Sequence, residues 1–130
     1  MALDRILLHL DPSSDPGSDP SSGDDGSRII RRAVDPADVY SLEADGGDTL
    51  VRLRSKQPLR DTRRLAELAP IFEPFGFLQI HRSHAVNLRR VLELRQRDEG
   101  QDWEVKLEPP VNAVLPVARE RREVVLAAFG

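Results

Sequence analysis

Cationic and hydrogen-bonding side chains follow directly on a short hydrophobic segment in the middle of the chain. Residues 77–82 alternate so that, in an extended strand, one row of side chains enters a core and the other row reaches solvent. Arg82 would then project from a rigid edge. Between residues 76 and 97 the chain carries five arginines (82, 89, 90, 95 and 97) and one acid, Glu93. The local positive field that results is suited to gripping nucleic acid.

The whole-chain charge hides an uneven distribution along the sequence. With 19 basic and 22 acidic residues, the formal net charge is -3. Residues 1–27 hold six of the acids and one basic residue, Arg5, which leaves 18 basic and 16 acidic residues in 28–130. That remainder is weakly cationic, at about +2 by this count. A polyanionic partner is therefore compatible with it.

Length and composition limit the class of protein. A chain of 130 residues with 39% hydrophobic content provides for one domain with a single core. The absence of cysteine excludes disulfides and thiolate metal sites and fits a reducing compartment. The apolar run within residues 3–10 is too short to span a membrane and lacks a small-residue cleavage site. We predict a soluble, cytoplasmic protein without a cofactor.

Residues 11–27 consist only of Asp, Pro, Ser and Gly, a composition that cannot bury enough apolar surface to offset its chain entropy. We predict a flexible acidic N-terminal tail over 1–27 and a folded domain over 28–130. Within the tail, residues 3–10 could form one or two amphipathic helical turns, remain a frayed terminus, or serve as a docking peptide.

From residue 28 onward, alternating apolar residues predict short antiparallel strands. Asp45-Gly46-Gly47-Asp48 supplies the positive-φ residues that a tight hairpin needs. Residues 98–102 connect the two strands of a second hairpin. Pro58 confines its segment to an edge or a bulge. The expected strands, besides 77–82, are 29–34, 38–43, 49–54, 56–60, 91–97, 103–107 and 111–115.

Two helices are expected among these strands. Asp61 or Thr62 can cap a short helix with apolar residues at 65, 68 and 69, and Pro70 ends it. A C-terminal helix over 119–129 offers three residues for docking, Val125, Leu126 and Phe129. The sequence predicts a mainly β fold of antiparallel sheets with one short internal helix and a C-terminal helix.

The motif Phe77-Leu78-x-x-His81-Arg82-Ser83-x-x-Val86-Asn87-Leu88 resembles the signature of the LytTR family, DNA-binding domains of bacterial transcription regulators. Residues 38–44 resemble an early strand of that family, 65–68 its short helix, and 115–119 its late Pro-Val-Ser-Arg motif. The resemblance covers nearly all of 28–130 and implies an elongated fold of antiparallel β-sheets. It further implies binding to duplex DNA, usually at paired direct repeats and with a second protomer.

The resemblance also assigns roles to particular residues. It implies that Arg82 and Arg119 read bases and that the first hairpin supplies a third contact, from Asp48 or Thr49. Two departures from the family pattern are Ala118, where a serine is usual, and the acidic residues of that hairpin. The family's common receiver domain is not expected, since residues 1–27 are too few to fold as one.

Arginine suits base readout because its planar fork donates to O6 and N7 of guanine together. Arg119 could instead pair with Glu123 one helical turn later. Arg121 and Arg122 could belong to a solvated helix face. The expected contacts to the DNA backbone are His81, Ser83, Arg89, Arg90, Arg121 and Arg122.

Three polar residues of the motif have structural alternatives. His81 is expected to stabilise the turn after its strand by hydrogen bonding, and Asn87 to close its own turn. A metal site is not expected, because His81 and His84 on one strand would point to opposite faces. Ser83 beside His84 does not make a nucleophile and base pair, since no orienting carboxylate is apparent.

The resulting hypothesis is a non-enzymatic transcriptional regulator that binds double-stranded DNA with base readout in the major groove. The alternative is a protein-interaction module of the same fold that has lost DNA binding, with the acidic tail or residues 3–10 engaging a regulatory protein. The acidic tail could also mimic DNA and compete for the basic face.

Overall fold

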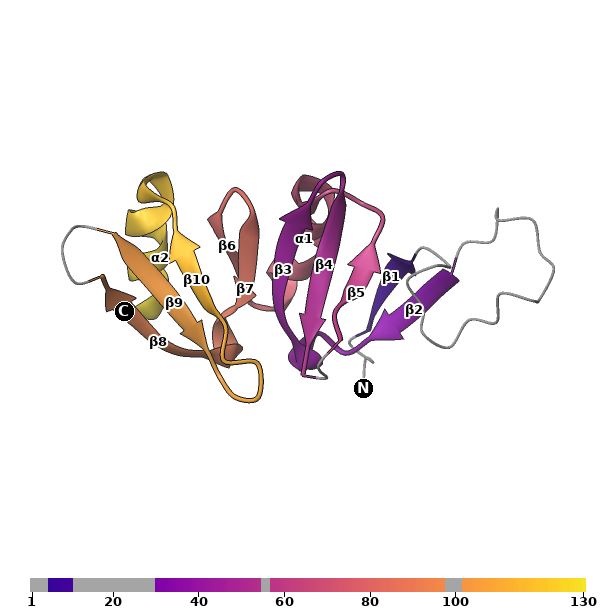
Figure 1. The fold of residues 1–130 in the computed structure, drawn as a ribbon, viewed down its shortest axis with the longest axis horizontal. Coiled ribbons are helices and arrows are strands. Elements are labelled where there is room, and N and C mark those ends of the chain that lie inside the picture. The colour runs from indigo at the N-terminus through magenta and orange to yellow at the C-terminus, as the bar shows by residue number, and fades with distance from the viewer. Residues whose placement is uncertain (1–4, 11–29, 55–56, 98–101) are drawn as a thin grey trace.

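The computed structural model describes residues 5–10, 30–54, 57–97 and 102–130, which form two antiparallel β-sheets set side by side in an elongated molecule (Figure 1). The prediction of a mainly β fold with an internal and a C-terminal helix is confirmed. The elements in chain order are β1 Ile6–Leu10, β2 Ile30–Val34, β3 Val39–Asp45, β4 Asp48–Leu53, β5 Leu59–Asp61, α1 Leu65–Phe72, β6 Phe77–His81, β7 His84–Asn87, β8 Val91–Gln96, β9 Trp103–Leu107, β10 Val114–Val117 and α2 Arg122–Phe129. Single 3₁₀ turns lie at Pro36–Asp38 (η3), Glu73–Phe75 (η4), Leu88–Arg90 (η5) and Arg119–Arg121 (η6).

The larger sheet has the strand order β2-β1-β5-β4-β3-β7-β6, and α1 covers one of its faces. Apolar residues at alternate positions of its strands point to that face, as the period of two requires. Together with the apolar side of α1 they form the first hydrophobic core, which contains Leu8, Leu42, Val51, Leu68 and Phe72.

The N-terminal segment is a strand of this sheet, so the prediction of helical turns or a frayed terminus within residues 3–10 is wrong for Ile6–Leu10. β1 lies between β2 and β5, and the side chains of Ile6, Leu8 and Leu10 are buried. β2 pairs with β1 along its whole length and β5 pairs with it at Leu10, while every second side chain of β1 is buried, which a free terminus could not achieve. This part of the predicted tail therefore belongs to the fold, whereas residues 11–29 lie outside the described residues.

Asp61 holds β1 in place instead of capping α1. Its fully buried carboxylate accepts hydrogen bonds from the His9 amide at 2.8 Å and from the Arg63 guanidinium at 2.8 and 3.0 Å. Arg63 in turn donates to the carbonyl of Leu7 at 3.0 Å. The residue at the N-cap of α1 is Arg64, which makes no side-chain cap.

Pro70 lies inside α1 and does not end it, contrary to the prediction. The missing amide of Pro70 deprives the carbonyl of Ala66 of its helical partner. Because Ala66 and Pro70 are both exposed, water can satisfy that carbonyl, and the helix continues to Phe72, which anchors it in the core.

The smaller sheet has the order β10-β9-β8, and it packs with α2 around a second hydrophobic core. The strand predicted at 111–115 begins later, at Val114. Only Val125 of α2 is buried, whereas Leu126 and Phe129 remain 36% and 38% exposed. The prediction that these two residues dock on the sheet is wrong, because a helix of eight residues presents only one narrow face to it.

The β6–β7 hairpin is shared by the two cores. Phe77 and Ala85 pack in the first core, whereas Ile80 and Val86 pack in the second. Because this hairpin carries buried side chains in both cores, its turn is held on a constrained base. Among the described residues, no helix combines the length and the apolar character needed to cross a membrane.

Candidate nucleic-acid interface

Arg82 lies in the two-residue turn between β6 and β7, where His81 pairs with His84. Its side chain is exposed, as the motif predicted. The carbonyl of Ser83, the other turn residue, accepts a 2.9 Å hydrogen bond from the amide of Ala44 on β3. The turn is thereby tied to the neighbouring strand and projects from the upper edge of the molecule in Figure 1.

Arg119 lies close to this hairpin because two hydrogen bonds join its segment to β6. The Ala118 amide donates to the carbonyl of Ile80 at 2.9 Å, and Arg121 Nε donates to the carbonyl of Gln79 at 2.9 Å. The side chain of Arg119 is 83% exposed. Its Nε lies 3.2 Å from a carboxylate oxygen of Asp102, so its ion pair is with Asp102 and not with the Glu123 considered from sequence.

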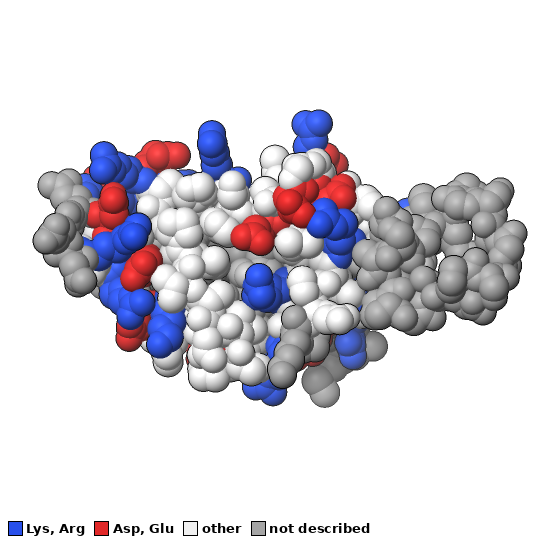
Figure 2. Space-filling view, viewed as in Figure 1, with Lys and Arg blue, Asp and Glu red and all other residues white. Residues whose placement is uncertain are grey.

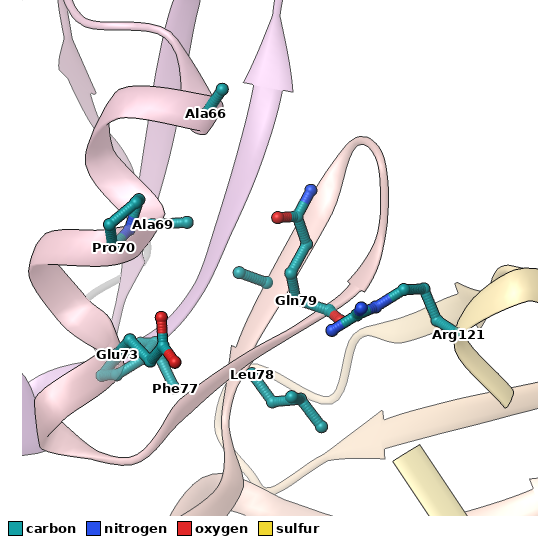
Figure 3. Close-up of a pocket in the computed structure, with 9 residues that line it drawn as sticks. Ala66, Ala69, Pro70, Glu73, Phe77, Leu78, Gln79 and Arg121 are labelled. Atoms are coloured by element: carbon teal, nitrogen blue, oxygen red, sulfur yellow. The ribbon is translucent and has the colours of Figure 1, made fainter. Parts of the chain in front are cut away.

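Arg121 is half-buried and faces a cavity of about 230 Å³ between α1 and β6 (Figure 3). In this view its guanidinium extends from η6 toward Gln79, while Glu73 approaches the cavity from the side of α1. Ala69, Phe77 and other small or apolar residues line the rest. The bond to Gln79 gives Arg121 a structural role that the sequence did not indicate. Arg122 is half-buried at the start of α2.

His81 and His84 lie side by side, with ring centroids 5.5 Å apart. The prediction that they point to opposite faces is wrong, because the chain reverses between them and makes them cross-strand partners. His81 Nδ1 accepts a hydrogen bond from the Ser83 amide at 3.1 Å, which confirms the expected turn-stabilising contact. No group of three metal-ligating side chains occurs within the described part of the chain.

His84 is enclosed beneath the turn, with a side chain that is 12% exposed. Its buried Nδ1 has no hydrogen-bond partner among the residues that the structure describes, and a carboxylate oxygen of Glu43 is 3.9 Å away. Burial lowers the pKa of His84, and the positive charge of Arg52 lowers it further, while Glu43 opposes this shift. The imidazole is therefore held in its neutral form.

Asn87 closes the turn after β7, as predicted. Its Oδ1 accepts from the amide of Arg89 at 3.0 Å. Its Nδ2 also donates to the carbonyls of Pro36 at 3.3 Å and Val39 at 3.0 Å, so this buried amide connects β7 to the start of β3.

Arg89 and Arg90 are not brought together with Arg82. They lie in η5, which follows the far end of β7, at the lower edge of Figure 1. Arg89 is exposed there. Arg90 donates to the carbonyl of Ala37 at 2.8 and 3.0 Å and lies over the ring of Tyr40 at 5.2 Å. Arg90 therefore joins η5 to η3 and β3.

The first hairpin does not present Thr49. This residue is completely buried, and its hydroxyl donates to the carbonyl of Arg63 at 2.8 Å. The predicted base contact from Thr49 is wrong, because Thr49 lies on the same face of β4 as the buried Val51 and points into the interior.

Arg60 on β5 pairs with both acids of the first hairpin, Asp45 and Asp48. The hairpin is therefore less acidic than its own residues indicate. Nothing in the local sequence identifies this partner, since it depends on the β4–β5 pairing. Figure 2 shows basic side chains projecting from the upper edge and a broad uncharged area on the front face.

Comparison with known proteins identifies the family and the fold. The profile of the LytTr DNA-binding domain family matches residues 31–130, so β1 precedes the matched part. The structure is similar to that of the LytTr DNA-binding domain of a methyl-accepting/DNA response regulator from Bacillus cereus, with a TM-score of 0.68. The alignment covers 99% of each chain at 16% sequence identity, a level at which it shows the shared fold. No curated protein matches the sequence.

Proposed function

Because the chain belongs to the LytTr DNA-binding domain family, we propose that it binds double-stranded DNA sequence-specifically, with Arg82 and Arg119 reading base edges in the major groove. We further propose that this binding serves transcriptional control and that two protomers occupy paired direct repeats. Arg121 and Arg122 follow Arg119 in η6 and at the start of α2, and their positive charges are proposed to favour the approach of phosphates.

One observation carries this proposal: two exposed guanidinium groups project from segments that are hydrogen-bonded to each other. The bond between the Ala118 amide and the Ile80 carbonyl places the start of η6 beside the end of β6, two residues before Arg82. A rigid scaffold of this kind can offer both arginines to one duplex at a constant spacing. Each bidentate contact to guanine contributes about 1–3 kcal/mol of discrimination against the wrong base.

The test is a selection from random duplex oligonucleotides, followed by binding measurements on the selected site and on scrambled DNA. Arg82→Ala and Arg119→Ala should each weaken binding to the selected site by about 1–3 kcal/mol and relax the sequence preference. Arg89→Ala is the matched control, because it removes an exposed arginine at the opposite edge. If Arg82→Ala binds the selected site and scrambled DNA with the same affinities as the parent, the proposed function is refuted.

The acids of the first hairpin favour a second candidate, a protein-interaction module of the same fold. Asp45 and Asp48 are 49% and 36% exposed and share a single arginine, so this turn keeps a net negative charge. Heparin retention separates the two functions, since a DNA-binding face should retain the chain and an acidic docking face should not. The same measurement after removal of residues 11–27 tests whether the acidic stretch competes for the basic face.

A further inference from the structure

The side chain of Arg82 is exposed, but the backbone around it is fixed at several points. Gln79 Nε2 donates to the carbonyl of His81 at 3.2 Å, and the Ala44 amide holds the carbonyl of Ser83 at 2.9 Å. The Ser83 amide, between these two anchors, is bound by the imidazole Nδ1 of His81 at 3.1 Å. The imidazole therefore completes the set of bonds that determines the direction in which Arg82 leaves the turn.

We propose that His81 is a positioning residue for Arg82, acting through the Ser83 amide and not by contact with DNA. This inference rests on the proposed function and adds to it a determinant of base specificity. The bond spans residues i and i+2, the spacing at which an Asx side chain closes a turn on its own backbone. An asparagine at position 81 could therefore reproduce it, whereas a phenylalanine could not.

The hydrogen bond imposes a protonation state on the ring. Nδ1 accepts from an amide, so it must carry no proton, and a doubly protonated imidazolium would turn an acceptor into a second donor. The bond therefore requires the imidazole tautomer that carries its proton on Nε2.

The first experiment compares His81→Asn and His81→Phe with the parent on the selected site and on scrambled DNA. We expect His81→Asn to keep the ratio of the two affinities within about twofold of the parent. We expect His81→Phe to lower the ratio roughly 5- to 100-fold, the range for loss of one specific base contact. Equal losses on both DNAs for the two variants would indicate a phosphate contact by His81 and overturn the proposal.

A double-mutant cycle separates the positioning of Arg82 by His81 from an independent contribution of His81 to the affinity ratio. In an Arg82→Ala background, His81→Phe should have no further effect on the affinity ratio, because the group that it positions is gone. Additive losses would overturn the proposal. If His81→Phe fails to fold, Gln79→Met removes the neighbouring bond to the carbonyl of His81 and should show the same dependence on Arg82.

A protein that binds no DNA sequence preferentially would refute the proposed function, whereas sequence preference that survives His81→Phe unchanged would overturn the positioning role alone.

Discussion

The amide of Ala118 donates a 2.9 Å hydrogen bond to the carbonyl of Ile80 and thereby joins the start of η6, which follows β10 of the smaller sheet, to β6 of the larger sheet. Ile80 itself is completely buried in the second core. The spacing of Arg82 and Arg119 is therefore a property of the contact between the two sheets. Substitutions that disturb this contact should alter DNA recognition even where they remove no DNA-facing group.

Arg121 offers a direct test of that contact. Arg121→Met should remove the bond to the carbonyl of Gln79, lower the preference for the selected site severalfold, and cost about 1 kcal/mol of unfolding free energy. Fluorescence anisotropy on selected and scrambled duplexes gives the preference. Arg89→Met serves as the control for a lost surface charge, and an identical response of the two variants would argue against coupling through η6.

The buried carboxylate of Asp61 should contribute to stability in a pH-dependent way. Burial alone raises the pKa of Asp61, but the hydrogen bonds from Arg63 and from the His9 amide outweigh it, so the folded protein has a lowered pKa at this group. The stabilisation is thus complete above the pKa of an unfolded aspartate, about 3.9, and is lost as the pH falls through the lower folded value.

Asp61→Asn should accordingly lower the unfolding free energy by about 3 kcal/mol at pH 7, because it leaves Arg63 without its anionic partner. The difference from the parent should shrink as the pH falls below about 4. Urea unfolding at a series of pH values measures both quantities. A difference that stays constant down to pH 2 would show that the charge of Asp61 is not responsible.

The side chains on the buried face of β1 should contribute to the stability of the domain, and those on its exposed face should not. Leu8→Ala should cost about 2–5 kcal/mol, since its side chain is completely buried in the first core. Leu7→Ala, one residue away with a side chain that is 54% exposed, should change stability by less than about 0.5 kcal/mol. Thermal unfolding of both variants would show whether the N-terminal segment is part of the cooperative unit.

Substitution of Asn87 should lower the unfolding free energy more than substitution of an ordinary turn residue. Asn87→Ala would leave the carbonyls of Pro36 and Val39 and the amide of Arg89 without partners, at a cost of about 2–4 kcal/mol. Guanidinium unfolding measures this cost, with Gln57→Ala, an exposed site, as the comparison. A loss no larger than that of Gln57→Ala would mean that water replaces all three bonds.

Much of the fold could be predicted because strand periodicity and turn chemistry are local properties. The hairpin at 45–48, the strands around residues 91–107 and the exposure of Arg82 all follow from patterns within a few residues. α1 was also predictable from its apolar spacing, although its end was not, because Phe72 extends it past Pro70 by packing in the core.

The sequence by itself determined which residues alternate between core and solvent and where the chain can turn, since both depend on side chains a few positions apart. Only the tertiary structure decided which segments become neighbours. β1 is a strand because β2 and β5 flank it, Thr49 bonds to the carbonyl of Arg63 because the chain after β5 passes beside it, and the start of η6 lies beside β6 through one backbone hydrogen bond. Backbone carbonyls and, except in proline, backbone amides are the same in every residue, so no residue type marks which of them will pair across such distances.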